Sequence, residues 1–160
     1  MRIYIVVISI LVSIDQIIKI IVRNTLTSSS YIELIPNFVH LTYQENKGIS
    51  FSLLADIPSA IRVPILTGVS ALVIIGLCIF IFKNRHNLTK GEMWGFSLIL
   101  SGAIGNLIDR AVRKQVTDYM FFHFFEKSFF VNNLADDLIS FGFVLIVWQS
   151  FRKKESKDEK

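Results

Sequence analysis

The chain has 160 residues, of which 52% are hydrophobic, and its mean hydropathy is +0.52. This composition excludes an ordinary soluble globule, and the length indicates one domain, residues 1–160. The single cysteine, Cys78, excludes an internal disulfide and any site built from several cysteines. The formal net charge of +4 is compatible with nucleic-acid binding, but the basic residues gather at the ends of apolar runs. We therefore interpret them as signals of membrane topology.

Four apolar runs approach the roughly 20 residues that a helix needs to cross a bilayer. They predict membrane-spanning helices at about 3–22, 63–82, 93–108 and 133–151, followed by a charged cytoplasmic tail at 152–160. The first run contains Asp15 and Lys19 and is not followed by a signal-peptide cleavage site, so we predict a retained helix. The fold class is therefore a mostly α membrane protein with four transmembrane helices.

One polar stretch has the pattern of β-strands. Residues 38–43 are β-branched and aromatic, and Asn46-Lys47-Gly48 is a turn signal followed by further alternation. We predict a small, cradle-like sheet at about 31–53 on the outer face of the membrane. We interpret this stretch as the only strand-like part of the chain, and residues 110–131 as a loop.

The density of Lys and Arg predicts the orientation of the chain. With both termini in the cytoplasm, nine basic residues lie in short cytoplasmic segments and seven lie in much longer outer segments. In this topology the unusual polar groups all fall at one depth, near the outer membrane surface. They are Asp15, Lys19, Asn46, Asn106, Asp109, Arg110, Asp118, Asn133, Asp136 and Asp137. We infer one polar site, because intramembrane ionisable groups are rare and usually functional.

Carboxylates are the best candidates for the chemistry of this site. The three histidines lack metal-ligand spacing, no serine is clearly paired with Lys19, and nothing indicates a metal or an organic cofactor. Two aspartates that share a proton can activate water, one as general base and the other as proton donor to a carbonyl. Asp118 and either Asp136 or Asp137 form the candidate pair, and composition does not choose between the last two.

Structural roles compete with this interpretation. Asp15 and Lys19, four residues apart, are spaced for an intrahelical ion pair, which is compatible with lining the site. Asp136 and Asp137 are also typical of the first turn of a helix capped by a preceding asparagine. Asp109 next to Arg110 suggests a structural ion pair at a helix end.

Five motifs resemble those of the lipoprotein signal peptidase family, also called signal peptidase II. In order, they are Asp15-Gln16-Ile17-Ile18-Lys19, Asn46-Lys47-Gly48-Ile49-Ser50-Phe51, Gly105-Asn106-Leu107-Ile108-Asp109-Arg110, Val116-Thr117-Asp118-Tyr119 and Asn133-Leu134-Ala135-Asp136. Their order and spacing extend the resemblance over nearly the whole chain. The pocket-forming positions Ile49, Ser50, Ser101 and Asn132 depart from the usual pattern of the family.

The resemblance implies an aspartyl endopeptidase of the bacterial cytoplasmic membrane that acts on prolipoproteins and cleaves just before the diacylglyceryl-modified lipobox cysteine. It implies Asp118 and Asp136 as the catalytic pair. It implies supporting or substrate-binding roles for Asp15, Lys19, Asn46, Gly48, Asn106, Asp109, Arg110 and Asn133. It further implies inhibition by cyclic peptides of the globomycin type, contact with membrane lipid, and no nucleic-acid partner. We expect a monomer.

Two further hypotheses concern motion and function. Segment 38–52, with Gly48 as a hinge, is expected to act as a lid over the site. The alternatives to an enzyme are a four-span transport protein, which predicts polar residues through the full membrane depth, and a scaffold subunit with structural ion pairs. A scaffold would tolerate Asp→Asn changes at positions 118 and 136.

Overall fold

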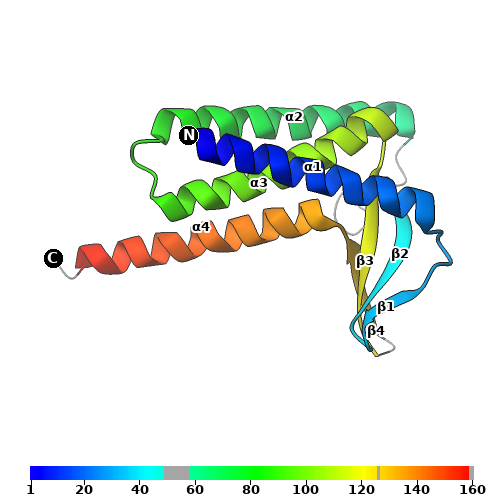
Figure 1. Cartoon of the computed structure of the whole chain (residues 1–160). Coiled ribbons are helices and arrows are strands. Elements are labelled where there is room, and N and C mark those ends of the chain that lie inside the picture. Colours follow the sequence, from blue (N-terminus) through cyan, green and yellow to red (C-terminus); the bar gives the residue numbers. More distant parts are fainter. Residues whose placement is uncertain (49–57, 126, 159–160) are drawn as a thin grey trace.

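The computed structural model describes residues 1–48, 58–125 and 127–158, with side chains through Arg152. The described chain forms four long helices and one sheet, and the sheet lies across one end of the helices (Figure 1). The helices are α1 (Arg2–Thr25), α2 (Ser59–Asn84), α3 (Lys90–Arg113) and α4 (Leu134–Asp158). The strands are β1 (Ile32–Ile35), β2 (Val39–Asn46), β3 (Val116–Phe124) and β4 (Lys127–Asn132).

The sheet is antiparallel throughout, in the order β1-β2-β3-β4. The prediction of strands after residue 31 is confirmed by β1 and β2, whereas 49–53 and the corresponding part of the expected lid lie outside the described residues. The prediction of a loop at 110–131 is wrong, because this stretch contains the end of α3, β3 and β4. Residues 116–122 are rich in β-branched and aromatic side chains, which favour a strand that is paired on both edges.

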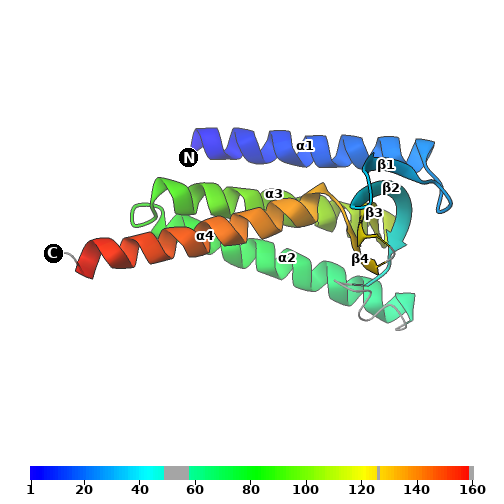
Figure 2. The same ribbon diagram turned by 90° about the horizontal axis from the view of Figure 1, so that it is seen from below.

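Helix α3 is the central helix of the bundle and packs against α1, α2 and α4 (Figure 2). Its small residues allow close approach. A Cβ atom on Gly95 would lie 2.8 Å from the backbone oxygen of Gly142, and one on Gly142 would lie 2.5 Å from the oxygen of Gly95. The backbones of α3 and α4 therefore touch at this crossing, as small residues permit in membrane helix pairs.

Three of the described helices are long and apolar enough to cross a membrane, namely α1, α2 and residues Leu134–Arg152 of α4. Helix α3 is not among them, so the expectation of four spans is supported for three. The reason lies in the position of α3. Since the other helices enclose it, its buried surface consists largely of Gly, Ser and polar residues rather than of the large apolar residues that lipid favours.

Helix boundaries differ from the sequence prediction in two informative places. The segment expected to be a tail continues α4 to Asp158. Helix α3 begins after a capping box made by Thr89 and Glu92, and it ends at Arg113, followed by the C-cap Lys114, whose φ of 66° is left-handed. The chain leaves this turn directly into β3, which brings Asp118 back beside the last turns of α3.

Candidate active site

Asp118 on β3 and Asp136 on α4 are joined by one side-chain amide. The Nδ2 atom of Asn133 donates to Oδ1 of Asp118 at 2.6 Å and to Oδ2 of Asp136 at 2.9 Å. These two carboxylate oxygens therefore lie at most about 5.5 Å apart, the sum of the two distances. The Oδ1 atom of Asn133 accepts the backbone N–H of Asp136 at 3.2 Å, which is an N-cap bond at the start of α4.

Two more asparagines bind the remaining carboxylate oxygens of the pair. Asn46 Nδ2 donates to Oδ2 of Asp118 at 3.0 Å, and Asn106 Nδ2 donates to Oδ1 of Asp136 at 2.8 Å. The Asn46 amide is itself oriented by the Gly48 backbone N–H, which donates to its Oδ1 at 3.0 Å. Neutral amides hold the carboxylates in place without forcing both to ionise, as close cations do.

The environment of Asp118 favours its protonated form. Its side chain is 3% exposed, and it belongs to β3 rather than to the loop that the sequence suggested. Burial, together with the nearby negative charge of Asp136, raises the pKa of Asp118 to about 6, against the opposing hydrogen bonds from Asn133 and Asn46. The pair therefore keeps a proton to a higher pH than a free aspartate does.

A buried ion network lies next to the pair. Lys19 Nζ is 3.0 Å from Oδ2 of Asp15 and 3.2 Å from Oδ2 of Asp109, and Lys19 and Asp15 are fully buried. Lys19 also donates to Oδ1 of Asn106 at 3.0 Å, which links the network to Asp136. The predicted Asp15–Lys19 ion pair is thus confirmed, and each buried charge has an opposite partner.

The expected pairing of Asp109 with Arg110 is wrong. Asp109 pairs with Lys19 and with Arg23, whose Nη1 lies 3.4 Å from its Oδ1. Neighbouring residues on a helix point to different faces, so Asp109 faces α1 while Arg110 turns to a cavity. Arg23 lies one turn beyond Lys19 on α1, and this spacing was a signal that the sequence interpretation missed.

The network also fixes the backbone beside each aspartate. Asp109 Oδ2 accepts the N–H of Thr117 at 3.1 Å, and Asp15 Oδ1 accepts the N–H of Ala135 at 3.2 Å. These residues immediately precede Asp118 and Asp136. The hydroxyl of Tyr119, to which the sequence interpretation gave no role of its own, accepts the N–H of Leu134 at 3.1 Å. Strand β3 and helix α4 are therefore held in a common register.

Asp137 belongs to a different set of contacts. It lies in the first turn of α4 and accepts a hydrogen bond from Asn132 Nδ2 at 2.6 Å. It is thus placed as a helix-start acid. Asp136, in contrast, shares Asn133 with Asp118, so the geometry distinguishes two aspartates between which composition did not choose.

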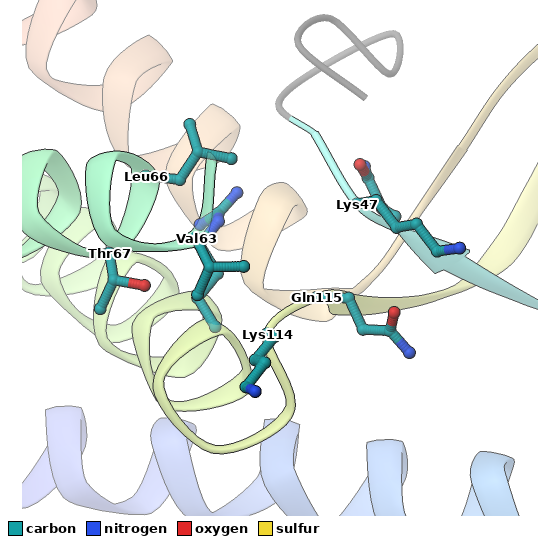
Figure 3. Close-up of a pocket in the computed structure, with 8 residues that line it drawn as sticks. Lys47, Val63, Leu66, Thr67, Lys114 and Gln115 are labelled. Carbon is teal, nitrogen blue, oxygen red and sulfur yellow. The ribbon is translucent and has the colours of Figure 1, made fainter. Parts of the chain in front are cut away.

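A cavity of about 520 Å³ opens beside Asp136 and is also lined by Asn106, Asn46 and Arg110, together with apolar residues of α2, α4 and β4. Among the described groups, Nε of Arg110 is buried and has no hydrogen-bond partner. A second pocket shares Asn46 and Arg110 and is bordered by Val63 and Thr67 (Figure 3), but it has no room for a water-sized sphere. Of these two pockets among the described residues, the larger is the candidate for binding a ligand.

No group of three or more His, Cys, Asp or Glu residues is arranged to hold a metal ion within residues 1–48, 58–125 and 127–158. Two buried carboxyls joined by one amide, with a raised pKa at Asp118 and a cavity beside Asp136, are an arrangement compatible with general acid–base chemistry.

The family model described as signal peptidase (SPase) II matches residues 7–152. This chain belongs to the signal peptidase II family. The match includes every residue of the polar site, from Asp15 to Asp136. The signal peptidase II family therefore accounts for nearly the whole chain.

Individual relatives agree with this assignment. The chain is 37% identical to the lipoprotein signal peptidase of Fusobacterium nucleatum, over 97% of this chain and 92% of the relative. It is 36% identical to that of Brucella ovis, over 88% of this chain and 84% of the relative. A solved bacterial membrane enzyme, determined by the in meso method at 2.3 Å resolution, is 27% identical with a TM-score of 0.86, covering 100% of this chain and 94% of that one. Shared fold and sequence thus extend over the helices and the sheet together.

Proposed function

We propose that this chain is an aspartic endopeptidase of the bacterial cytoplasmic membrane. It removes the signal peptide from diacylglyceryl-modified prolipoproteins by cleaving just before the lipidated lipobox cysteine. The observation that supports the proposal most directly is the Asn133 amide, which lies within 2.6 and 2.9 Å of carboxylate oxygens of Asp118 and Asp136. Family membership supplies the substrate class, since the curated relatives are lipoprotein signal peptidases.

In the proposed reaction the pair begins with one carboxylate and one protonated carboxyl. The carboxylate takes a proton from water, and the resulting hydroxide oxygen bonds to the scissile carbonyl carbon. The other carboxyl gives its proton to the carbonyl oxygen, which yields a neutral diol. Then the carboxylate just formed removes a proton from the diol, the C–N bond breaks, and the first carboxyl protonates the leaving amine of the cysteine. The pair ends with one proton, as it began.

The cavity suits a substrate with an apolar and a polar part. Val69 and Val73 of α2 and Ile139 of α4 line it together with Asp136 and Arg110. In our proposal the apolar walls contact the signal peptide and the acyl chains, while the unpartnered Nε of Arg110 donates to a backbone carbonyl of the substrate. This contact orients the scissile bond towards the two carboxyls.

The proposal includes a location and an inhibitor class. Both termini lie in the cytoplasm, so the sheet and the aspartate pair lie at the outer surface, where the lipidated cysteine emerges. The chain acts as a monomer, without nucleic acid, and cyclic peptides of the globomycin type bind in the same cavity. The described polar network lies at one end of the helices, which favours a peptidase over a transport protein with polar groups at every depth.

The deciding experiment compares Asp118→Asn and Asp136→Asn with Asp137→Asn in the full-length protein. Vesicles containing a diacylglyceryl-modified prolipoprotein report cleavage on a gel, and thermal unfolding reports the fold. We expect the first two variants to lose at least about 100-fold in rate, because each removes an acid–base group. Asp137→Asn should retain most of the rate, since Asp137 contacts Asn132 instead of the pair. Processing at the wild-type rate by either of the first two variants would refute the pair.

A further inference from the structure

Two histidines lie beside each other on neighbouring strands, at a distance from the aspartate pair. His40 is on β2 and His123 is on β3, and their ring centroids are 5.1 Å apart. The cross-strand partner of His40 is Phe121, two residues before His123, so the imidazoles take diagonal positions on one antiparallel pair of strands. At about 3.3 Å per residue, His123 lies about 16 Å from Asp118 along β3. The two histidines therefore form a separate cluster.

Each imidazole has one ring nitrogen without a hydrogen-bond partner. Within the described residues 1–48, 58–125 and 127–158, Nδ1 of His40 and Nε2 of His123 are buried and form no hydrogen bond. The side chain of His123 is closely packed, because the residue is only 7% exposed. Buried polar atoms in native proteins are nearly always satisfied, by protein groups, water or an ion. Two such nitrogens on neighbouring rings therefore point to a common ligand between them.

The tautomer of His123 is determined by its other ring nitrogen. Nδ1 of His123 lies 2.9 Å from the backbone carbonyl oxygen of Phe125. A carbonyl oxygen only accepts, so Nδ1 carries the hydrogen and Nε2 of the neutral ring has a lone pair that can bind a metal. A hydrogen bond from one imidazole nitrogen to a backbone carbonyl is a usual way in which metal-binding histidines are oriented. His123 is therefore arranged as a metal ligand would be.

The surroundings of His40 fix its ring and keep it neutral. The ring stacks on Phe121 with a centroid distance of 4.6 Å, and the ring of Tyr31 lies 4.0 Å away. Burial, together with the neighbouring imidazole of His123, lowers the pKa of His40, against the opposing effect of the Glu33 carboxylate. His40 is therefore neutral near neutral pH, which is the form in which imidazole binds a metal. Glu33, its cross-strand partner on β1, adds a negative charge that favours a cation.

The spacing of the two rings fits a divalent transition metal ion. Imidazole nitrogen is a ligand for Zn²⁺, Cu²⁺ and Ni²⁺, with a zinc–nitrogen distance of about 2.0–2.1 Å. Each ring centroid then lies about 3.2 Å from the metal, so two imidazoles in tetrahedral positions have centroids about 5 Å apart. The observed distance between the centroids is 5.1 Å. Among the described residues no third His, Cys, Asp or Glu completes the ligand set, so water takes the remaining positions.

We propose that His40 and His123 together bind a divalent transition metal ion of the class of Zn²⁺ and Cu²⁺, through Nδ1 of His40 and Nε2 of His123. The bound ion links β2 to β3 and stabilises their pairing, because it binds only when the two strands are together. The ion takes no part in peptide cleavage. The site is independent of the aspartate pair, so it stands or falls separately from the proposed peptidase function.

Copper binding tests the proposal. The full-length protein, without a polyhistidine tag that would itself bind metal, is titrated with Cu²⁺ in detergent. Electron paramagnetic resonance then counts the imidazole nitrogens on the copper. His40→Phe and His123→Phe each remove one ligand and keep an aromatic ring in the stack. His86→Phe is the matched control, because His86 is exposed and lies in the α2–α3 connection at the opposite end of the helices (Figure 1). Thermal unfolding with and without Zn²⁺ gives a second measurement.

We expect two imidazoles on the copper in wild type and in His86→Phe. His40→Phe and His123→Phe should bind Cu²⁺ at least about 10-fold more weakly, and Zn²⁺ should no longer raise their unfolding temperature. If His40→Phe and His123→Phe bind Cu²⁺ as tightly as wild type, or if wild-type copper carries fewer than two imidazoles, the proposal is wrong. Absence of metal binding, with a wild-type stability that changes through the ordinary titration range of histidine, would also overturn it and would assign the pair to a shared proton. Because two positions are changed, misfolding of one variant leaves the other to decide.

Discussion

Asn133 shows how much one side chain determines at the residue scale. Its oxygen caps α4, and its nitrogen reaches both Asp118 and Asp136. A side-chain amide carries an acceptor oxygen and an NH₂ group with two donor hydrogens on the same carbon, so neither Asp nor Ser can replace all of these bonds. The residue that starts the helix is therefore also the one that sets the spacing of the aspartates.

The raised pKa of Asp118 predicts how stability depends on pH. Its folded-state pKa of about 6 lies above the ordinary value of 3.8. Protonated Asp118 therefore favours the folded state fully below about pH 4, and this stabilisation is lost as the pH rises through about 6. The side chain of the Asp118→Asn variant stays neutral at every pH. Between pH 4 and 7 the free energy of unfolding of the wild type should therefore fall by on the order of 2 kcal/mol relative to that of this variant.

Thermal unfolding in detergent at several pH values measures this difference. Asp137→Asn serves as the control, because it leaves the buried pair intact, and its profile should follow that of the wild type more closely. Parallel profiles for wild type and Asp118→Asn would mean that burial does not shift the pKa of Asp118.

Glycines decide the packing at the element scale, where α3 meets α4. A Cβ atom on Gly102 would overlap the backbone oxygen of Ala135, which lies in the first turn of α4 next to Asp136. Gly102→Ala must therefore shift α4, and we expect a loss of about 1–3 kcal/mol in stability together with slower cleavage. A Cβ atom on Gly76 of α2 would meet no neighbouring side chain within 4 Å, so Gly76→Ala is the matched control.

Thermal unfolding and the cleavage assay on both glycine variants distinguish the effect of the α3–α4 contact from the effect of the higher helix propensity of alanine. Alanine is the better helix former by about 1 kcal/mol, so Gly76→Ala should unfold at the same temperature as wild type or higher. If the two variants have the same stability and cleavage rate, α4 can move away from Gly102 without loss of stability, and the prediction is wrong.

The elements differ in how far the sequence predicts them. Long apolar runs located α1, α2 and α4 because lipid demands a strong and uniform signal. Strands β3 and β4 were missed, since Asp118 and the surrounding aromatic residues were interpreted as a loop between two spans. A strand at a membrane surface does not need a long, uniformly apolar sequence. The pairing of β3 with β2 depends instead on residues far away in sequence.

The residues of the site could likewise be predicted only in part. Charged residues in apolar helices are conspicuous, so Asp15, Lys19 and Asp109 could be found from sequence. Their partners could not all be assigned from sequence. Asp109 could pair with Arg110, next to it in the chain, or with Arg23 on another helix, and the structure has the pair with Arg23. Such a choice depends on which helix faces which, and that information arises only when the helices pack.

At the scale of the whole molecule, the polar groups concentrate at one end of the bundle. The C-terminal end of α1, the sheet, the end of α3 and the start of α4 meet there, while the α2–α3 connection lies at the other end (Figure 1). A buried network such as Lys19 with Asp15 and Asp109 is tolerable at this end, because each charge is paired and the sheet covers it. The middle of each lipid-facing helix is left apolar.

The distribution of Lys and Arg predicts which membrane face this polar end occupies. Ser28 follows α1 at the polar end, and His86 lies in the α2–α3 connection, and both are exposed. In the Cys78→Ala background, we expect Ser28→Cys to react with a membrane-impermeant maleimide in spheroplasts, whose cytoplasmic membrane is intact. His86→Cys should react only after the membrane is permeabilised, because short basic segments remain in the cytoplasm. The reverse labelling pattern would place the aspartate pair on the cytoplasmic side, where a precursor that has already crossed the membrane does not present its lipidated cysteine.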